Sequence, residues 1–242
     1  MKKVFISMKK VFDGIYSDGL NEKANYADGR IYTRSMIKGN RVYGEKIVCE
    51  ENEEYREWDP FRSKYCAAVK SGLKESIFFS GAKVLYLGSA EGTSVSHVAD
   101  IVGEKGFVFG VDISETAMDK LIGLSEVMKN IFPIVADAQS PEEYADFLGG
   151  KVDALFQDVS QRNQAEIFLR NARFLKSGGM GALTIKTKSI SQVKKKQDIL
   201  AEEREKLSKE FLIMQVIPLE SSEKGHRVVF EKDHYVILVK KK

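Results

Sequence analysis

The sequence has few of the features that mark secreted or membrane proteins. Only two of its 242 residues are cysteine, Cys49 and Cys66, too few for a disulfide framework and without the spacing of a metal site. No apolar run approaches the roughly 20 residues that cross a bilayer, and no long apolar segment follows the first three residues, as a secretory signal requires. We therefore expect a cytoplasmic protein in a reducing compartment, with both cysteines packed as ordinary buried side chains.

A dominant charge of one sign is also missing. Lysine and arginine number 38 and aspartate and glutamate 35, so the net charge is only +3. This mild basicity permits a nucleic-acid partner without requiring one. Hydrophobic residues make up 43% of the chain, enough for a conventional core, and the length suits one large α/β domain with a small extension.

The first 55 residues differ in pattern from the rest of the chain. Short β-prone pieces, separated by Asp-Gly and Gly-Asn turns, occupy 4–6, 11–12, 15–16, 31–33 and 42–43. This pattern predicts a small antiparallel β-hairpin domain over residues 1–55. Such a unit is too small to bury much core alone, so we expect it to pack on the main domain, residues 56–242, or on a partner.

From Trp58 onward the pattern alternates strands and helices. Strands are predicted at 83–88, 107–112, 131–136, 152–157 and 180–186, and two more close the chain at 211–219 and 234–240. Helices are predicted at about 61–75, 92–102, 115–129, 141–148, 162–176 and 192–209. The alternation implies an α/β fold with a parallel sheet covered on both faces. A final hairpin with one antiparallel strand resembles the seven-stranded, Rossmann-like methyltransferase sheet more than a dehydrogenase.

Glycines and acids follow the predicted strands at the edge where open parallel sheets bind ligands. Gly88 and Gly92 bracket the first turn, Asp112 ends the second strand, and Asp137 follows the third. Bare backbone at such a turn can approach a nucleotide-like cofactor, while an acid at the next strand end accepts hydrogen bonds from ribose hydroxyls. An ordinary tight turn and helix N-caps explain the same residue types. The turn lacks the full G-x-G-x-x-G pattern of nicotinamide dehydrogenases.

Two further strand ends carry an acid and a lysine. Asp158 ends the fourth predicted strand and Lys186 ends the fifth, and neighbouring strands are expected to place these side chains close together. The pair is either an ordinary ion pair or, at a cofactor rim, a couple that places and deprotonates a hydroxyl. Composition and spacing alone do not bring Lys64 or His234 to this site.

Four segments resemble the fibrillarin family, and they occur in the family's order. They are Tyr-Arg-Glu-Trp-Asp-Pro-Phe-Arg-Ser-Lys at 55–64, Tyr-Leu-Gly-Ser-Ala-Glu-Gly-Thr-Ser-Val-Ser-His at 86–97, Asp-Val-Ser-Gln at 158–161 and Phe-Glu-Lys-Asp-His at 230–234. The resemblance covers the methyltransferase part and, less distinctly, the N-terminal module. The long Gly/Arg-rich extension of eukaryotic members is missing, so the chain is similar to the archaeal members.

The resemblance implies an activity and partners. Fibrillarin-like proteins are RNA 2′-O-ribose methyltransferases that transfer a methyl group from S-adenosyl-L-methionine to guide-selected nucleotides of rRNA and tRNA. They act as the catalytic subunit of a box C/D ribonucleoprotein. The implied partners are box C/D guide RNA, target rRNA or tRNA, a Nop-type scaffold protein and a kink-turn-binding protein of ribosomal type, with no membrane partner. Because guide pairing selects the nucleotide, the enzyme need not read bases, which agrees with the modest charge.

The resemblance also implies a set of site residues. The family's catalytic set falls on Lys64, Asp158, Lys186 and His234. In this assignment Lys186 contacts the ribose hydroxyl and stabilises or accepts its proton, Asp158 orients Lys186, and the other two complete the pocket. The implied cofactor-binding residues are Gly88, Ser89, Gly92, Thr93, Asp112, Ile113, Asp137, Ala138, Asp158 and Gln161. No metal site is implied.

The sequence departs from the family pattern in places. Glu91 adds a negative charge beside the cofactor loop, and Asp112 stands where Glu is commoner. His226 competes with His234 as the family histidine, and we favour His234 because its Asp-His pair is intact. His97, on the helix after the glycine turn, is expected to be structural.

Other interpretations stay open at this point. The three lysines at 194–196 form either a solvated helix face or a contact to the RNA backbone. A small-molecule O-methyltransferase would share the fold and cofactor, but the sequence has no evident lid segment or metal cluster. A structural ribonucleoprotein subunit that has lost its activity is the third possibility, and the intact Lys64, Asp158 and Lys186 argue against it.

Overall fold

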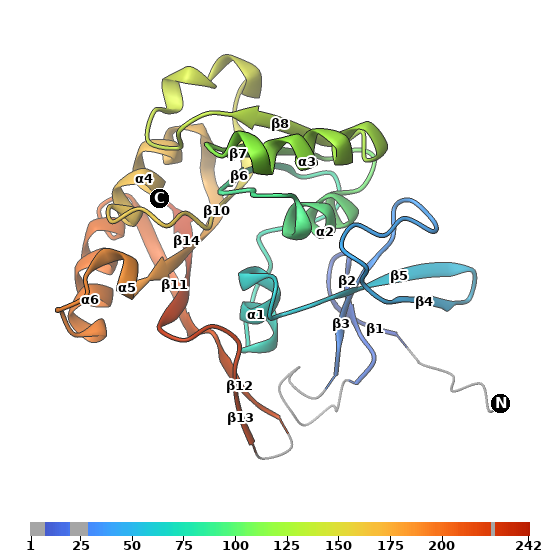
Figure 1. Cartoon of the computed structure of the whole chain (residues 1–242). Coiled ribbons are helices and arrows are strands. Elements are labelled where there is room, and N and C mark those ends of the chain that lie inside the picture. Colours follow the sequence, from blue (N-terminus) through green and yellow to red (C-terminus); the bar gives the residue numbers. More distant parts are fainter. Residues whose placement is uncertain (1–7, 20–28, 224–225) are drawn as a thin grey trace.

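The computed structural model describes residues 8–19, 29–223 and 226–242. Two sheets organise the chain, a five-stranded sheet near the N-terminus and a seven-stranded sheet in the remainder (Figure 1). The α/β class with a seven-stranded sheet and a separate small antiparallel module is confirmed. The piece expected at 4–6 lies outside the described residues. No helix of the described ranges is both long and apolar enough to cross a membrane.

The N-terminal module is an antiparallel sheet in the order β1-β2-β3-β5-β4. Its strands are β1 (Lys9–Phe12), β2 (Ile15–Ser17), β3 (Ile31–Arg34), β4 (Ile47–Glu50) and β5 (Glu53–Trp58). The β-prone pair at 42–43 is not a strand, because Glu45 accepts hydrogen bonds from the backbone N–H of Val42 and Tyr43 and holds this segment as a turn. The boundary expected between residues 55 and 56 falls inside β5, all of which belongs to this sheet, so we propose a boundary after Trp58.

A buried polar network fastens the module to the main domain. The Arg56 guanidinium, fully buried, pairs with Glu45 of the module at 2.6 Å and with Asp100 of the main domain at 2.8 Å. The His97 ring is also buried, between Thr33 Oγ1 at 2.7 Å and Tyr43 OH at 2.8 Å. The structural interpretation of His97 is confirmed, and the expected packing of the module on the main domain is observed.

The main sheet has the order β11-β14-β10-β9-β6-β7-β8. Its strands are β6 (Lys83–Leu87), β7 (Phe107–Asp112), β8 (Ile131–Val135), β9 (Val152–Gln157), β10 (Leu175–Lys186), β11 (Phe211–Pro218) and β14 (His234–Lys241). Strand β14 runs antiparallel to both β10 and β11, and the pairs from β10 to β8 are parallel. The five parallel strands therefore end at one edge of the sheet.

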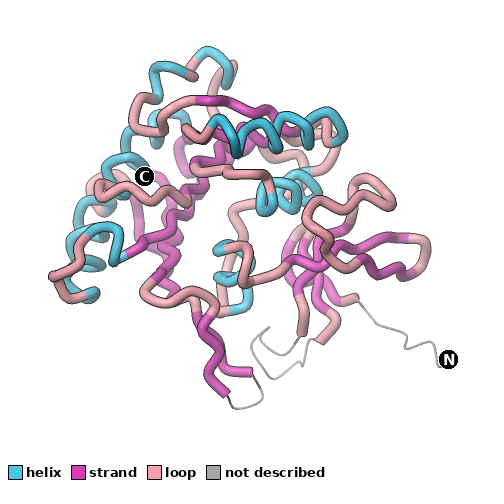
Figure 2. The backbone as a smooth tube through the Cα atoms, viewed as in Figure 1, coloured by secondary structure: helices cyan, strands magenta, loops and turns pink. Residues whose placement is uncertain are grey.

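Helices cover both faces of this sheet (Figure 2). The α-helices are α1 (Lys64–Lys70), α2 (Thr93–Val102), α3 (Glu115–Val127), α4 (Gln164–Asn171), α5 (Thr187–Ile190) and α6 (Lys196–Leu207). Side chains in β6 alternate between two cores: Tyr86 packs toward α1 and α2, whereas Leu87 packs toward α4 and α6. This two-sided burial explains the continuous apolar runs of the parallel strands.

Several predicted elements differ in detail. The helix expected at 141–148 is two short 3-10 turns, η2 (Pro141–Glu143) and η3 (Asp146–Leu148), because two consecutive glycines follow at once and end the segment. The helix expected at 162–176 ends earlier, after α4 and η4 (Ala172–Phe174), since β10 already begins at Leu175.

Two further differences concern a hairpin and a cysteine. An unexpected hairpin, β12 (Glu220–Glu223) and β13 (His226–Val229), precedes β14. Cys66 is buried as expected, whereas the expectation for Cys49 was wrong, because its side chain is on the exposed side of edge strand β4.

Candidate active site

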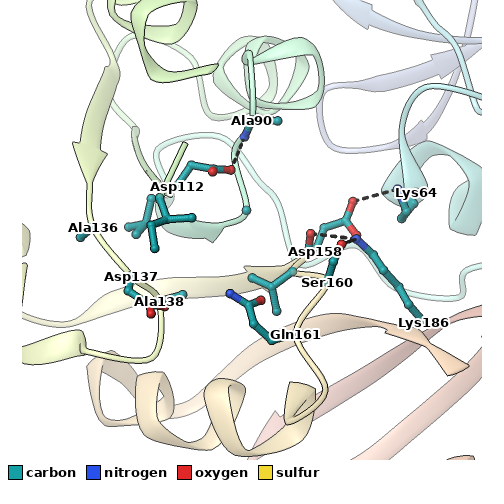
Figure 3. A pocket seen from close by; sticks show the side chains of 14 residues that line it. Lys64, Ala90, Asp112, Ala136, Asp137, Ala138, Asp158, Ser160, Gln161 and Lys186 are labelled. Carbon is teal, nitrogen blue, oxygen red and sulfur yellow. Dashed lines mark hydrogen bonds and ion pairs between the residues drawn. The ribbon is translucent and has the colours of Figure 1, made fainter. Parts of the chain in front are cut away.

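A cavity of about 560 Å³ opens at the edge where the parallel strands end. This volume suits a ligand of nucleotide size. Its walls come from the ends of β6, β7, β8, β9 and β10 and from the start of α1 (Figure 3). The lining residues are Lys64, Gly88, Ala90, Val111, Asp112, Ile113, Ala136, Asp137, Ala138, Asp158, Val159, Ser160, Gln161 and Lys186.

Gly88 lets the ends of β6 and β9 approach each other. Its φ is +81°, and a Cβ at this position would lie 2.6 Å from the carbonyl oxygen of Asp158. The backbone N–H of Asp158 donates to the carbonyl of Leu87 at 2.8 Å, so the two strand ends are joined at this point. Both requirements, the positive φ and the missing side chain, can be met only by glycine.

Asp112, at the end of β7, and Asp137, just after β8, line another wall of the cavity. Asp112 accepts hydrogen bonds from the backbone N–H of Ala90 at 2.8 Å and of Ser114 at 3.0 Å. The N-cap of α3 is Ser114, so Asp112 does not cap that helix. Asp137 accepts from the backbone N–H of Gln139 at 2.9 Å. Each carboxylate has about four acceptor sites, so both retain lone pairs for ribose or adenine donors.

Three of the expected cofactor residues shape the turn without lining the cavity. Ser89 is buried, with its hydroxyl 3.6 Å from the sulfur of Met118. Gly92, with φ +91°, is the N-cap of α2, and Thr93 is the first residue of that helix. The turn reaches the cavity instead through Gly88 and Ala90.

Asp158 lies between two lysines (Figure 3). Its Oδ1 atom is 2.9 Å from the Lys186 ammonium, and its Oδ2 atom is 3.1 Å from the Lys64 ammonium. Asp158 and Lys186 therefore meet as their neighbouring strands predicted. Lys64 reaches the same carboxylate because Ser63 caps α1 and places Lys64 at its first turn. In the sequence, only the family resemblance assigns Lys64 to this site.

The Lys186 side chain is held by more than its ion pair. Its ammonium donates to Ser160 Oγ at 2.9 Å and to the carbonyl of Asp158 at 3.2 Å. The Lys186 backbone N–H donates to Gln164 Oε1 at 2.9 Å, and the Gln164 amide donates to the carbonyl of Gln161. Sequence reasoning did not select Ser160 or Gln164. The only signal was the position of Ser160 inside the Asp-Val-Ser-Gln segment.

His234 is placed beside Lys186 by strand register. It is the first residue of β14 and pairs directly opposite Lys186 of β10, so both side chains project from the same face of the sheet. Its Nδ1 atom is 2.8 Å from the carbonyl oxygen of Lys232. The ring lines a second, adjacent cavity and not the first. The side chain of His226, the alternative residue, is outside the described part of the structure.

The first cavity has two features that fit an organic cofactor. Gln161 lines it, and the buried Gln161 Oε1 atom has no hydrogen-bond partner among the described residues. Ile113 lines it too, and its apolar side chain is 62% exposed. A bound adenine-containing ligand would satisfy the amide oxygen and cover the isoleucine. Among the described residues, no group of three or more His, Cys, Asp or Glu side chains is arranged to hold a metal ion.

The sheet order, the antiparallel β14 and the cavity beyond the strand ends together define a Rossmann-like domain of the methyltransferase class. The family model of fibrillarin matches residues 6–235. A relative named fibrillarin-like rRNA/tRNA 2′-O-methyltransferase, from Thermococcus sibiricus, is 42% identical over 96% of this chain and 98% of its own length. The chain therefore belongs to the fibrillarin family.

Two solved structures extend this comparison. Aeropyrum pernix fibrillarin, determined with natively bound S-adenosyl-L-methionine, is 36% identical and has a TM-score of 0.82 over 97% of this chain and 98% of its own. A chain from a fibrillarin/Nop5p complex is 31% identical, with a TM-score of 0.80 over 97% of this chain and all of its own.

Proposed function

We propose that this protein transfers a methyl group from S-adenosyl-L-methionine to the ribose 2′-hydroxyl of guide-selected nucleotides in rRNA and tRNA. The observation that carries the proposal is the Lys64–Asp158–Lys186 cluster at the wall of the cofactor-sized cavity. The name of the Thermococcus sibiricus relative and the ligand bound to Aeropyrum pernix fibrillarin support the same substrate and donor.

The residues that would hold the donor divide between the two walls. Asp112 and Ile113 would bind the ribose side, Asp137 and Ala138 the adenine, and Gln161 the methionine end. Gly88, Ser89, Gly92 and Thr93 would form the turn beneath it. When bound, S-adenosyl-L-methionine supplies an electrophilic methyl group on a cationic sulfur.

The chain's own residues would then position the acceptor. Lys186, fixed by its partners, would contact the 2′-hydroxyl; as the ammonium it would stabilise the oxygen while the hydroxyl loses its proton, and as the neutral amine it would accept that proton. Asp158 would orient Lys186 and offset the repulsion between the two ammonium groups that it pairs with. Lys64 and His234 would complete the acceptor side, with His234 approaching from β14. Methyl transfer requires the ribose hydroxyl to lie in line with the methyl–sulfur bond, so the main contribution of these residues would be positioning.

The proposed setting is a box C/D ribonucleoprotein with guide RNA, target RNA, a Nop-type scaffold and a kink-turn-binding protein. The scaffold has support in the solved fibrillarin/Nop5p complex. The guide RNA and the kink-turn-binding protein rest on the family resemblance.

The test is methyl transfer by the reconstituted complex. The protein is assembled with guide RNA, scaffold and kink-turn-binding protein, and radiolabelled donor is supplied with a complementary target RNA. Label should appear at one nucleotide and render the adjacent phosphodiester resistant to alkali. A target with 2′-deoxyribose at that nucleotide should remain unlabelled. Transfer to the 2′-deoxy target, or no transfer to the normal one, would overturn the proposal.

A further inference from the structure

A group of exposed lysines surrounds the junction where β10 and β14 meet beside the candidate site. Thr187, directly after Lys186, donates through both its backbone N–H and its hydroxyl to the carbonyl of Asp233, at 3.2 and 3.0 Å. The Lys196 ammonium lies 3.9 Å from the Asp233 carboxylate. Three chain segments, the start of α5, the start of α6 and the loop before β14, therefore converge at Asp233.

Each of these segments presents a lysine to solvent. Lys188 adjoins Thr187, Lys232 adjoins Asp233, and the Lys196 side chain is 53% exposed. In the part of the chain that the structure describes, no carboxylate forms an ion pair with Lys188 or Lys232. We name Lys188, Lys196 and Lys232 the junction lysines.

Most carboxylates around the junction lysines are engaged with other side chains. Lys196 and Lys232 line the second cavity together with His234. Of the three carboxylates there, Asp233 lies 3.9 Å from the Lys196 ammonium, Glu220 is paired with Arg227, and Glu231 lies 3.8 Å from the His234 ring. Lys196 also begins α6, whose N-cap residue supplies no side-chain hydrogen bond, so the helix end favours an anion. Among the lysines at 194–196, Lys194 is instead paired with Glu202 at 2.6 Å.

We infer that the junction lysines bind the phosphodiester groups of the target RNA that flank the acceptor ribose. This inference rests on the proposed function. The phosphodiesters are attached to the same sugar as the 2′-hydroxyl, and the junction begins one residue after Lys186, so in this inference a strand whose hydroxyl reaches Lys186 carries its neighbouring phosphates past the junction. Phosphate contacts fix the register of a nucleic acid and do not read its sequence. The junction lysines would thus hold the sugar-phosphate backbone beside Lys186, while guide pairing selects the nucleotide.

The experiment compares two triple variants in the reconstituted complex. The first replaces all three junction lysines by glutamine, which removes the charge and keeps most of the length. The control replaces Lys105, Lys129 and Lys209 by glutamine; these are exposed and lie at the opposite edge of the sheet, before β7, β8 and β11. The affinity for target RNA is measured as a function of salt concentration, with donor binding and the maximal transfer rate measured in parallel.

Each lost phosphate contact should reduce the slope of log affinity against log salt by about 0.7 to 0.9. The junction variant should therefore lose about 2 to 3 in slope, while donor affinity and the rate at saturating RNA stay within about twofold. The control variant should keep the original slope. Equal slopes in both variants would overturn the inference.

Two further arms identify the ligand. Neutral methylphosphonates placed beside the acceptor nucleotide of the target strand should weaken binding by the original protein and leave the junction variant unaffected. The same groups in the guide strand should have no such selective effect; a selective effect there would assign the lysines to the guide and refute the inference. If the junction variant fails to assemble with the scaffold protein when target RNA is absent, the junction lysines contact protein, and the inference is refuted. Methyl transfer by the original protein is measured in every experiment. Absence of that transfer would refute the proposed function, whereas unchanged salt dependence in the junction variant would refute only the inference about the lysines.

Discussion

Replacement of Gly88 by alanine tests how the strand ends build the cavity. Two costs apply at this position. The φ of +81° is one that residues with a side chain adopt at a cost of roughly 1–2 kcal/mol. The new Cβ would also lie 2.6 Å from the Asp158 carbonyl oxygen and 2.9 Å from its carbon, both backbone atoms that cannot rotate away. Forcing an extra methyl group into a packed site costs roughly 1–3 kcal/mol more.

The chain offers a matched control for this substitution. Gly81 also has φ +81°, but a Cβ there would meet nothing within 4 Å. Gly81→Ala therefore carries the backbone cost alone, roughly 1–2 kcal/mol, and Gly88→Ala roughly 2–5 kcal/mol in total. The difference between the two variants isolates the contact with Asp158.

Two assays check this prediction. Urea denaturation gives the free energy of unfolding, and calorimetry gives the affinity for S-adenosyl-L-methionine. Gly88→Ala should lose at least about tenfold in donor affinity, because the clash pushes Asp158 away from the β6 turn, whereas Gly81→Ala should bind the donor normally. Equal loss of stability in the two variants, together with unchanged donor binding by Gly88→Ala, would refute this account of the cavity.

Three other predictions concern single side chains. Asp158→Asn should lower the rate of a single methyl transfer by on the order of 100-fold without unfolding the protein; a rate within threefold of the original would contradict its orienting role. Ser160→Ala should lower that rate by at least about 10-fold, since one hydrogen bond to a charged group contributes about 1.5–3 kcal/mol, while Ser160→Thr retains the hydroxyl and should restore it; equal rates for the two variants would remove Ser160 from the positioning of Lys186. Burial, reinforced by the positive charge of Arg56, holds the pKa of His97 well below its ordinary value. Below about pH 6.5 the unfolded chain therefore binds a proton that the folded chain does not, so stability should fall with decreasing pH by up to about 1.4 kcal/mol per unit; a His97→Gln variant should lose this part of the slope, and an unchanged slope would contradict the assignment.

Local patterns predicted the elements that depend on short-range rules. Apolar runs with turns gave the positions of β6, β7, β8 and β9, because strands buried on both faces have no polar alternation. Strand–helix alternation gave the parallel sheet, which in turn brought Asp158 and Lys186 to one edge, since the carboxyl ends of parallel strands lie together. The helix ends were less accurate, since packing and following strands decide where a helix stops.

The rest depended on contacts between residues distant in sequence. Lys64 comes from α1 and His234 from β14, and only the assembled sheet places them on either side of Asp158 and Lys186. The burial of Arg56 and His97 likewise exists only because the N-terminal module packs on α2. Ser160 contacts Lys186 because its loop folds back over the end of β10. By itself the amino-acid order determined which residue types follow each strand; only the tertiary structure decided which of them meet, because strand order and register in the sheet arise from the packing of the whole chain.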